Sequence, residues 1–530
     1  MIGESASESL FIRFWIICFR YMPVLYIVSF VSTFLFPTDS NSLRKLRVVL
    51  LFLLVAELLF FISVYAPHKK RLRRAARHPV AATPGERKAL FEKCVANTSQ
   101  PEKYIKWWFL GADLKDIRHD NLREFFLWAF FDMDMEMQCQ GPEDIAQDVW
   151  QELDEYIVLT EQQLGLQFRE GRGPAKCLRL TFDDIHSTYR CLLWYFIMFL
   201  LDMATHAALS WHGFCYYARS FEESSATFPP RPQELFATYR SPVPKLGYWF
   251  KPHSCPTQRP LIFWHGIGVG LWTYVPFLIQ LSTTAGFGDV GLIVPEMLSI
   301  SFRLTQPLPR KDELLEMMAK ILDHHRQWEN FTLISHSYGS VPTTHMLHSP
   351  ILKRRVAAIV LIDPVTILLH LPDVAYNFTR RPPKRANEWQ LWYFASSDLG
   401  VAYSLGRLFF WRENILWRED LVATTVKLTA EGHAQPTRRK VAVSLSARDL
   451  IVDAASVAAY LTSKPQIVTA DGTIGVPEEY SDMHSNEVDV MVFPDLDHAQ
   501  VFDWKYARDR VVQLIHSYGG LGGNDAINVS

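Results

Sequence analysis

One short segment in the second half of this 530-residue chain constrains its fold more than any other. Residues 332–334 have the apolar character of a buried strand, and residues 341–348 have the spacing of a helix. Only a few residues join the two, so the chain must turn sharply between them. Ser337 stands on that turn, and the small residues Ser335 and Gly339 lie two positions to either side of it. The pattern predicts a strand–turn–helix unit that presents a serine hydroxyl.

Short apolar runs recur on both sides of this unit and alternate with segments of helical spacing. The runs expected to form strands are 246–251, 260–264, 290–294, 356–362, 440–445 and 487–493, and the clearest helix is 312–327. Strands that alternate with helices indicate an α/β fold with a mostly parallel sheet and helices on both faces. In such a sheet, functional side chains gather at the carboxyl ends of the strands.

Two polar segments stand where a serine at this edge needs partners. Asp449 follows the expected strand 440–445, and His498 follows the last strand. A histidine there can act as a base toward Ser337, and a carboxylate can hold the required tautomer of its imidazole. Asp363, directly after the strand 356–362, is the alternative acid. We favour Asp449 and keep Asp363 as the second candidate.

A glycine-rich turn follows the expected strand 260–264. It reads His265-Gly266-Ile267-Gly268, and no Gly-Lys-Ser/Thr follows, so a phosphate-binding loop is not expected. Glycines in this place let a backbone N–H group approach the serine. We expect the N–H groups of Ile267 and Tyr338 to bind developing negative charge, as an oxyanion hole does. His265, Gly266 and Gly268 are expected beside the substrate.

In this order, Ser337, Asp449 and His498 match the α/β-hydrolase fold superfamily, and residues 242–518 resemble its membrane-anchored serine esterase and lipase-like members. The resemblance implies that Ser337 is the nucleophile, His498 the base and Asp449 the acid. In that superfamily the turn reads Gly-x-Ser-x-Gly. Here Ser335 replaces the first glycine, which is a small change. The serine in place of an aspartate argues against epoxide-hydrolase or dehalogenase chemistry.

The sheet pattern is interrupted between residues 364 and 436, where such hydrolases insert a cap. This stretch is rich in aromatic residues, among them Trp389, Trp392 and Trp411. Aromatic side chains over a pocket suit an apolar acyl or sterol-like substrate. A cap that packs these rings into a small core of its own is an equally good interpretation.

The N-terminus resembles a membrane anchor. Residues 10–36 and 48–66 are apolar and about long enough to cross a bilayer of roughly 30 Å, although Arg20 and Pro23 interrupt the first. A basic run at 68–77 follows directly and places this side in the cytosol by the positive-inside rule. A shallow first segment that does not span is the alternative, because the loop between the two segments is also basic. A third apolar run at 191–201 is too short to span, which favours a core helix or one lying on the membrane.

Composition excludes several classes of function. The formal net charge of −2 gives no basic field for nucleic acid. Seven scattered cysteines without C-x-x-C spacing indicate free thiols and no zinc site. We expect neither a metal nor a cofactor.

These observations divide the chain into a membrane anchor, a linker, a helical region, a hydrolase domain and a tail. The expected bounds are 1–67 for the anchor, 68–85 for the basic linker, 86–236 for the mainly helical region, 237–518 for the α/β-hydrolase domain with a cap at 367–435, and 519–530 for a flexible tail.

The expected function is a membrane-anchored serine hydrolase, with its catalytic domain in the cytosol, that cleaves an apolar, lipid-like carboxylic ester through an acyl-enzyme. Its expected partners are the lipid bilayer and the ester substrate. An acyltransferase that uses the same triad, or a catalytically silent scaffold that binds a lipid or a protein, is the alternative. The sequence leaves the membrane and the oligomeric state open.

Overall fold

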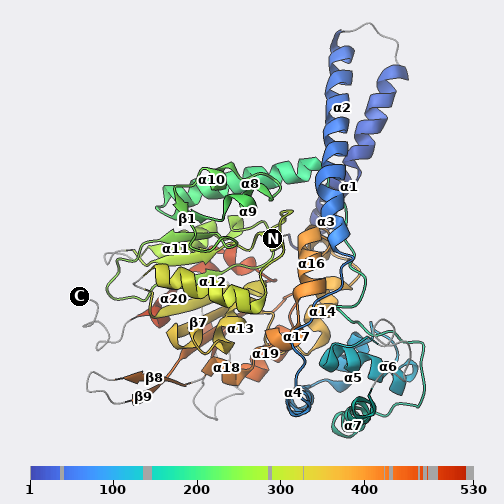
Figure 1. Ribbon diagram of the computed structural model, residues 1–530, viewed down its shortest axis with the longest axis vertical. Helices are drawn as coiled ribbons and strands as arrows, with labels where there is room; N and C mark the ends of the chain where they lie inside the picture. Colours follow the sequence, from blue (N-terminus) through green and yellow to red (C-terminus); the bar gives the residue numbers. More distant parts are fainter. Residues whose placement is uncertain are drawn as a thin grey trace.

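The computed structural model describes residues 2–35, 41–134, 146–283, 289–325, 328–422, 424–428, 434–462, 466–469, 474–475 and 488–520. A helical hairpin at the N-terminus stands out from a body built around one large sheet (Figure 1). A tail was expected at 519–530, and its residues 521–530 lie outside the described part of the chain.

The sheet has 11 strands in the order β12-β11-β13-β10-β7-β6-β4-β5-β3-β1-β2. Its central strands β5, β4, β6, β7, β10 and β13 run parallel, whereas β3 pairs antiparallel with β5 and with β1. The strands are β1 (Cys215–Ala218), β2 (Tyr239–Arg240), β3 (Tyr248–Lys251), β4 (Leu261–Trp264), β5 (Leu292–Pro295), β6 (Phe331–His336), β7 (Val356–Ile362), β10 (Lys440–Ser446), β11 (Gln466–Val468), β12 (Ile474–Gly475) and β13 (Asp489–Phe493). The expected α/β class is confirmed.

All the strands expected from the sequence are present, with small shifts at their ends. The sequence did not reveal the short strand β1, which lies before the expected start of the domain at 237. Four residues are too few to show a period, and β1 is recognisable only by its pairing with β3. The sheet therefore begins earlier in the chain than expected.

Helices cover both faces of the sheet, and the side chains of β4 show how. Ile262 and Trp264 belong to one buried cluster, together with residues of α12 (Lys311–His324) and α13 (Ser340–His348). The alternate residues, Leu261 and Phe263, join a second cluster with α11 (Val275–Ser282) and α20 (Lys505–Gly519). Successive side chains of a strand point to opposite faces, so burial on both sides explains the continuous apolar runs in the sequence.

The hairpin consists of α1 (Ala6–Leu35) and α2 (Asn41–Phe60), and α2 continues through a π-helical turn (Phe61–Tyr65) into α3 (Ala66–Arg71). α1 continues through Arg20 and Pro23 without a break, and its 30 residues span about 45 Å. Its first half packs on the body through Ile12, Ile16 and Phe19. The remaining part exposes apolar side chains and is long enough to enter a bilayer.

The third apolar run is longer than the sequence suggested. Ten of the expected eleven residues form the first half of α8 (Leu192–Trp211), a helix of 20 residues, and Cys191 precedes it. Among the described residues, three helices are long and apolar enough to cross a membrane, namely α8 and the two helices of the hairpin. The run seemed short because Asp202 and His206 interrupt it, yet Asp202 is buried against Arg231 at 2.7 Å. Figure 1 shows α8 lying across the direction of the hairpin, along the top of the body.

The region between the hairpin and α8 is helical, and the insert after β7 forms a cap. The helices before α8 are α4 (Pro84–Ala96), α5 (Pro101–Trp108), α6 (His119–Phe126) and α7 (Gln147–Leu164). The cap contains α14 (Pro372–Thr379), α15 (Ala386–Gln390), a π-helical segment (Leu391–Ser396), α16 (Leu399–Leu408), α17 (Trp411–Asn414), α18 (Arg418–Val422) and the hairpin of β8 (Thr424–Leu428) and β9 (Ala434–Arg438). The Trp108 indole donates to the His370 carbonyl at 3.0 Å, which ties the helical region to the segment between β7 and α14.

Candidate active site

Ser337 lies on a strained turn between β6 and α13. Its φ of +52° is in the left-handed region, which non-glycine residues rarely adopt. Gly339 is required in this turn, because a Cβ atom there would lie 2.2 Å from the carbonyl oxygen of Trp264. Gly266 approaches from the loop after β4, where an added Cβ would lie 2.9 Å from the Cβ of Ser337. The turn accommodates Ser335, which is buried in β6.

A chain of hydrogen bonds links Ser337 to the ends of two neighbouring strands. The Nε2 atom of His498, after β13, lies 2.8 Å from Oγ of Ser337. On the other side of the ring, Nδ1 lies 2.6 Å from Oδ2 of Asp449, after β10. The second carboxylate oxygen of Asp449 accepts the N–H groups of Ile451 at 2.7 Å and Val452 at 3.0 Å. The carboxylate is thus fixed, and it favours the tautomer with a proton on Nδ1.

The alternative acid, Asp363, has different partners. It accepts the N–H group of Ser446 at 2.8 Å, the hydroxyl of Ser446 at 3.0 Å and the N–H group of Ala499 at 3.1 Å. These bonds join the end of β10 to the loop that carries His498. The hydrogen bond to the imidazole goes to Asp449, so the geometry favours Asp449 as the acid.

A third carboxylate, Asp497, was not singled out from the sequence. Its Oδ1 atom accepts the N–H groups of Leu450 at 3.0 Å and His498 at 2.7 Å. Its Oδ2 atom accepts the side-chain amide of Asn387 at 2.8 Å, which connects the cap helix α15 to the site. The only signal in the sequence is the position of Asp497 next to His498.

These acids control the charge of the imidazole. Burial opposes protonation of His498, but the charge of Asp449, with smaller contributions from Asp363 and Asp497, outweighs it and raises the pKa of His498 to about 9. Burial, reinforced by the charge of Asp449, raises the pKa of Asp363 to about 7. The acids therefore stabilise the imidazolium that forms when His498 takes up a proton.

Asp363, Asp449 and His498 also form a group of possible metal ligands, with ligand atoms within 4.8 Å of one another. These atoms already make short hydrogen bonds. The ring bonds to Asp449, and Asp363 accepts three donors from Ser446 and Ala499. The arrangement fits a proton relay better than a cation site.

Two backbone N–H groups lie where the sequence places an oxyanion hole. Ile267 and Tyr338 both line the cavity next to Ser337. Among the described residues, no hydrogen-bond partner is found for the N–H group of Ile267. Tyr338 is in the first turn of a helix, where N–H groups lack partners within the helix. The N–H group of Gly268 donates to the carbonyl of Ile300 at 3.2 Å and holds the loop in place.

The other residues expected beside the substrate have other roles. His265 is buried, and its Nε2 atom accepts the N–H group of Met297 at 2.9 Å. Trp389 packs edge to face on Trp392, and the indole of Trp411 donates to the carbonyl of Ala129 at 2.9 Å. None of these four lines the described cavity at Ser337. Trp389 and Trp392 pack on each other within the cap, as the second interpretation expects, and Trp411 is directed toward the helical region.

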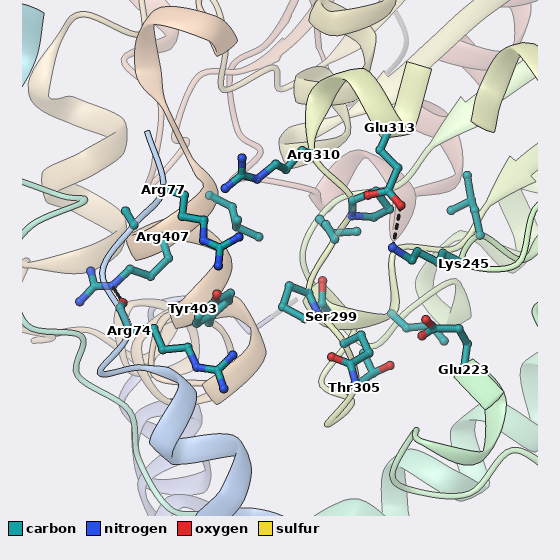
Figure 2. Close-up of a pocket in the computed structure, with 18 of the residues that line it drawn as sticks. Arg74, Arg77, Glu223, Lys245, Ser299, Thr305, Arg310, Glu313, Tyr403 and Arg407 are labelled. Carbon is teal, nitrogen blue, oxygen red and sulfur yellow. Dashed lines mark hydrogen bonds and ion pairs between the residues drawn. The ribbon is translucent and has the colours of Figure 1, made fainter. Parts of the chain in front are cut away.

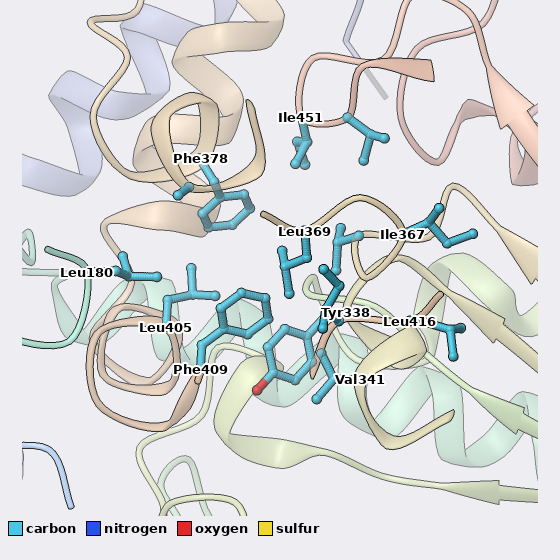
Figure 3. Packing of buried hydrophobic residues seen from close by; sticks show 14 of the residues in the cluster. Leu180, Tyr338, Val341, Ile367, Leu369, Phe378, Leu405, Phe409, Leu416 and Ile451 are labelled. Atoms are coloured by element: carbon cyan, nitrogen blue, oxygen red, sulfur yellow. The ribbon is translucent and has the colours of Figure 1, made fainter. Parts of the chain in front are cut away.

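The cavity beside Ser337 is small and apolar. Its free volume is about 20 Å³. Its other walls are Leu180, Ile267, Tyr338, Val365, Val374, Ala375, Phe378, Thr379, Leu405, Phe409 and Ile451. Figure 3 shows Phe378, Leu405 and Phe409 packed above Tyr338, so cap helices α14 and α16 and the residue after α16 close the cavity.

No family model and no curated protein matches the chain. Among solved structures, a membrane phospholipase A described as a bacterial virulence factor is 11% identical, with a TM-score of 0.34, over 62% of this chain and 92% of that one. A putative lipase from Acinetobacter baumannii AYE is 11% identical, with a TM-score of 0.34, over 59% and 93%. Naproxen esterase from Bacillus subtilis is 12% identical, with a TM-score of 0.33, over 59% and 97%.

The fold itself follows from the topology of this chain. The sheet has six parallel strands, and β5 lies between β4 and β3, so the order of strands in the sheet departs from their order in the chain. A serine stands on the turn after β6. Residues that follow β10 and β13 meet that serine at the carboxyl edge of the sheet. The core of this protein has the α/β-hydrolase fold.

Proposed function

We propose that the protein is a membrane-anchored serine hydrolase that cleaves an apolar, lipid-like carboxylic ester through an acyl-enzyme. The hydrogen-bonded series of Ser337, His498 and Asp449, next to an apolar cavity, supports this proposal most directly. A serine hydroxyl that donates to an imidazole held by a carboxylate is activated as a nucleophile.

In the proposed reaction, Oγ of Ser337 attacks the carbonyl carbon of the ester while its proton passes to Nε2 of His498. The bond to the alcohol oxygen then breaks, and His498 returns the proton to the departing alcohol. Water, deprotonated by His498, attacks the acyl-serine. The bond between the acyl carbon and Oγ of Ser337 then breaks, His498 returns the proton to Oγ, and the acid leaves. The N–H groups of Ile267 and Tyr338 stabilise the oxyanion, and each such donor is worth about 10²–10³ in rate.

The cavity walls support an apolar acyl group. A charged or strongly polar acyl group would lose its hydration there and gain almost no hydrogen-bond partners. The free volume of about 20 Å³ holds little more than a methyl group. A longer chain therefore enters only when Phe378, Leu405 or Phe409 moves aside, and the proposal assigns that movement to the cap.

A fluorophosphonate probe tests the nucleophile. We expect the probe to label the wild-type protein and not Ser337→Ala, because the phosphonyl group bonds to the activated serine oxygen. Ser335→Gly is the matched control, two residues away, and it should be labelled like the wild type. Labelling of Ser337→Ala, or no labelling of folded wild type, contradicts the proposal. Release of the free acid in water identifies a hydrolase. If the acyl group is transferred to an added alcohol and no free acid is released, the protein is an acyltransferase.

A pair of substitutions tests the acid and the pH dependence. Asp449→Asn should lower kcat about 10⁴-fold, because the amide no longer holds the productive tautomer. Asp363→Asn should retain far more activity and shift its pH profile. His498 acts as a base only when neutral, so activity rises with pH through its pKa. The charge of Asp363 raises that pKa, so its removal should move the rising limb of kcat/KM to lower pH.

The profiles are measured with a soluble short-chain ester between pH 5 and 10. Loss of activity in Asp363→Asn alone would show that Asp363 is the acid. A shift of the rising limb to higher pH would contradict the electrostatic account.

We further propose that α1 and α2 of the anchor 1–67 cross the membrane and that the hydrolase domain 237–518, extended to include β1, lies in the cytosol. The basic run at 68–77 joins the hairpin to the body and supports this side. α8 is proposed to lie in the membrane surface, because it runs across the hairpin (Figure 1). Its outer side exposes Phe196, Leu200 and Trp211.

Protease treatment of sealed vesicles tests this orientation. With the cytosolic face outward, the hydrolase domain should be digested while the hairpin is protected. A protected hydrolase domain would place it on the opposite side. Digestion after detergent treatment is the control for access.

A further inference from the structure

A second, much larger cavity lies away from Ser337. Its volume is about 780 Å³, within the range of small-molecule sites. It lies between the linker after α3, the segment before α12 and the cap helix α16, as Figure 2 shows. Six cationic and three acidic side chains line it, so its charge is positive.

Three arginines give the cavity its positive charge. Arg74 and Arg77 come from the linker, and Arg310 comes from the residue before α12. In Figure 2 their side chains enter the same gap, with the two linker arginines facing Arg310 and Ser299 across it. Within the described parts of the chain, none of the three guanidinium groups has a hydrogen-bonding or ion-pair partner.

Most other charges in the wall are already compensated. Lys245 pairs with Glu313 at 2.7 Å, Arg219 with Glu234 at 2.7 Å, and Glu296 with Arg231 at 2.9 Å. Arg407 donates to the carbonyls of Arg74 at 2.7 Å and Thr181 at 3.1 Å. Glu223 is the remaining acid in the wall, and it stands on the far side from the linker (Figure 2). The three guanidinium groups of Arg74, Arg77 and Arg310 therefore face the cavity, and Glu223 is the one acid of the wall outside these ion pairs.

The wall also offers neutral hydrogen-bond donors. Ser299 is 5% exposed, and its hydroxyl has no hydrogen-bond partner among the described residues. A buried hydroxyl without a partner costs free energy, which a ligand atom can recover. The hydroxyl of Tyr403, on α16, lies in the gap between the linker arginines and Ser299 (Figure 2). The cavity thus combines three guanidinium forks with two hydroxyl groups.

We propose that this cavity binds a phosphate group. Guanidinium groups match the geometry of phosphate oxygens with paired hydrogen bonds, and several of them compensate a multiply charged anion. The linker leaves the hairpin at Arg71, so Arg74 and Arg77 lie within a few residues of the proposed anchor. That position suits the headgroup of an anionic phospholipid, and a soluble phosphate compound has the same chemistry.

The site adjoins the cap but not the reacting groups. Tyr403 and Arg407 of α16 face this cavity, whereas Leu405 of the same helix faces the cavity at Ser337. The phosphate proposal depends on the arginines and hydroxyl groups of this cavity and is independent of the proposed hydrolase activity. Its test measures binding, so failure of one proposal leaves the other intact.

The full-length protein carries Ser337→Ala in every sample, so that the proposed hydrolase cannot cleave the ester probes. In phosphatidylcholine nanodiscs it is titrated with dihexanoyl phosphatidic acid, inorganic phosphate or uncharged dihexanoylglycerol, and Kd is measured by calorimetry. We expect Arg77→Gln/Arg310→Gln to weaken binding of the phosphatidic acid at least about 10-fold. Arg73→Gln is the matched control, because Arg73 is exposed in the same run but does not line the cavity. It should change Kd less than about twofold.

The three probes distinguish the source of the phosphate. Tighter binding of phosphatidic acid than of inorganic phosphate supports a lipid headgroup, and equal binding supports a soluble phosphate compound. The proposal is overturned if neither anion binds, if dihexanoylglycerol binds as tightly as phosphatidic acid, or if the double variant binds like the wild type. A melting temperature equal to that of the wild type shows that the double variant is folded.

Discussion

The hydrogen bond between Asp449 and His498 is the interaction on which the site depends. It joins the loops after two adjacent parallel strands, and it is buried beneath the cap. A carboxylate and an imidazole buried together lose much hydration, which only well-placed partners compensate. The N–H groups of Ile451 and Val452 bind Asp449, and the two other carboxylates fix the neighbouring backbone. The sheet, the loops and the cap therefore act together to hold one imidazole in one orientation.

The cap is braced from three sides. Asn387 connects it to Asp497, and Trp411 connects it to the helical region. The start of the chain reaches it as well, where the N–H group of Ile2 donates to Gln390 at 3.1 Å and Arg13 lies 5.3 Å from the ring of Trp389. The proposed membrane anchor and the cover of the apolar cavity are thus in direct contact. In this arrangement, movement of the cap during substrate entry also affects its contacts with α1.

Much of this arrangement could be predicted from the sequence. Ser337, Asp449 and His498 each follow a continuous apolar run, so the parallel sheet brings them to one edge. The role of Asp497 and its bond to Asn387 depend on contacts between distant segments, and no local pattern encodes those. For the tryptophans of the cap, the sequence left open whether they line the pocket or form a core within the cap, because composition does not specify the direction of a side chain. The basic linker was interpreted only as a cytosolic flank. Its part in a positively charged cavity could not be predicted, because Arg310, which lies across that cavity, comes from a distant part of the chain.

The central claim is that Ser337 carries the acyl group during turnover. Rapid quenching of the protein with p-nitrophenyl butyrate, followed by mass spectrometry of its peptides, tests this claim most directly. The account predicts one butyryl group on the peptide that contains Ser337, appearing within the first turnover and disappearing as substrate is exhausted. Turnover without acylation of that peptide, or acylation of a different residue, would contradict it.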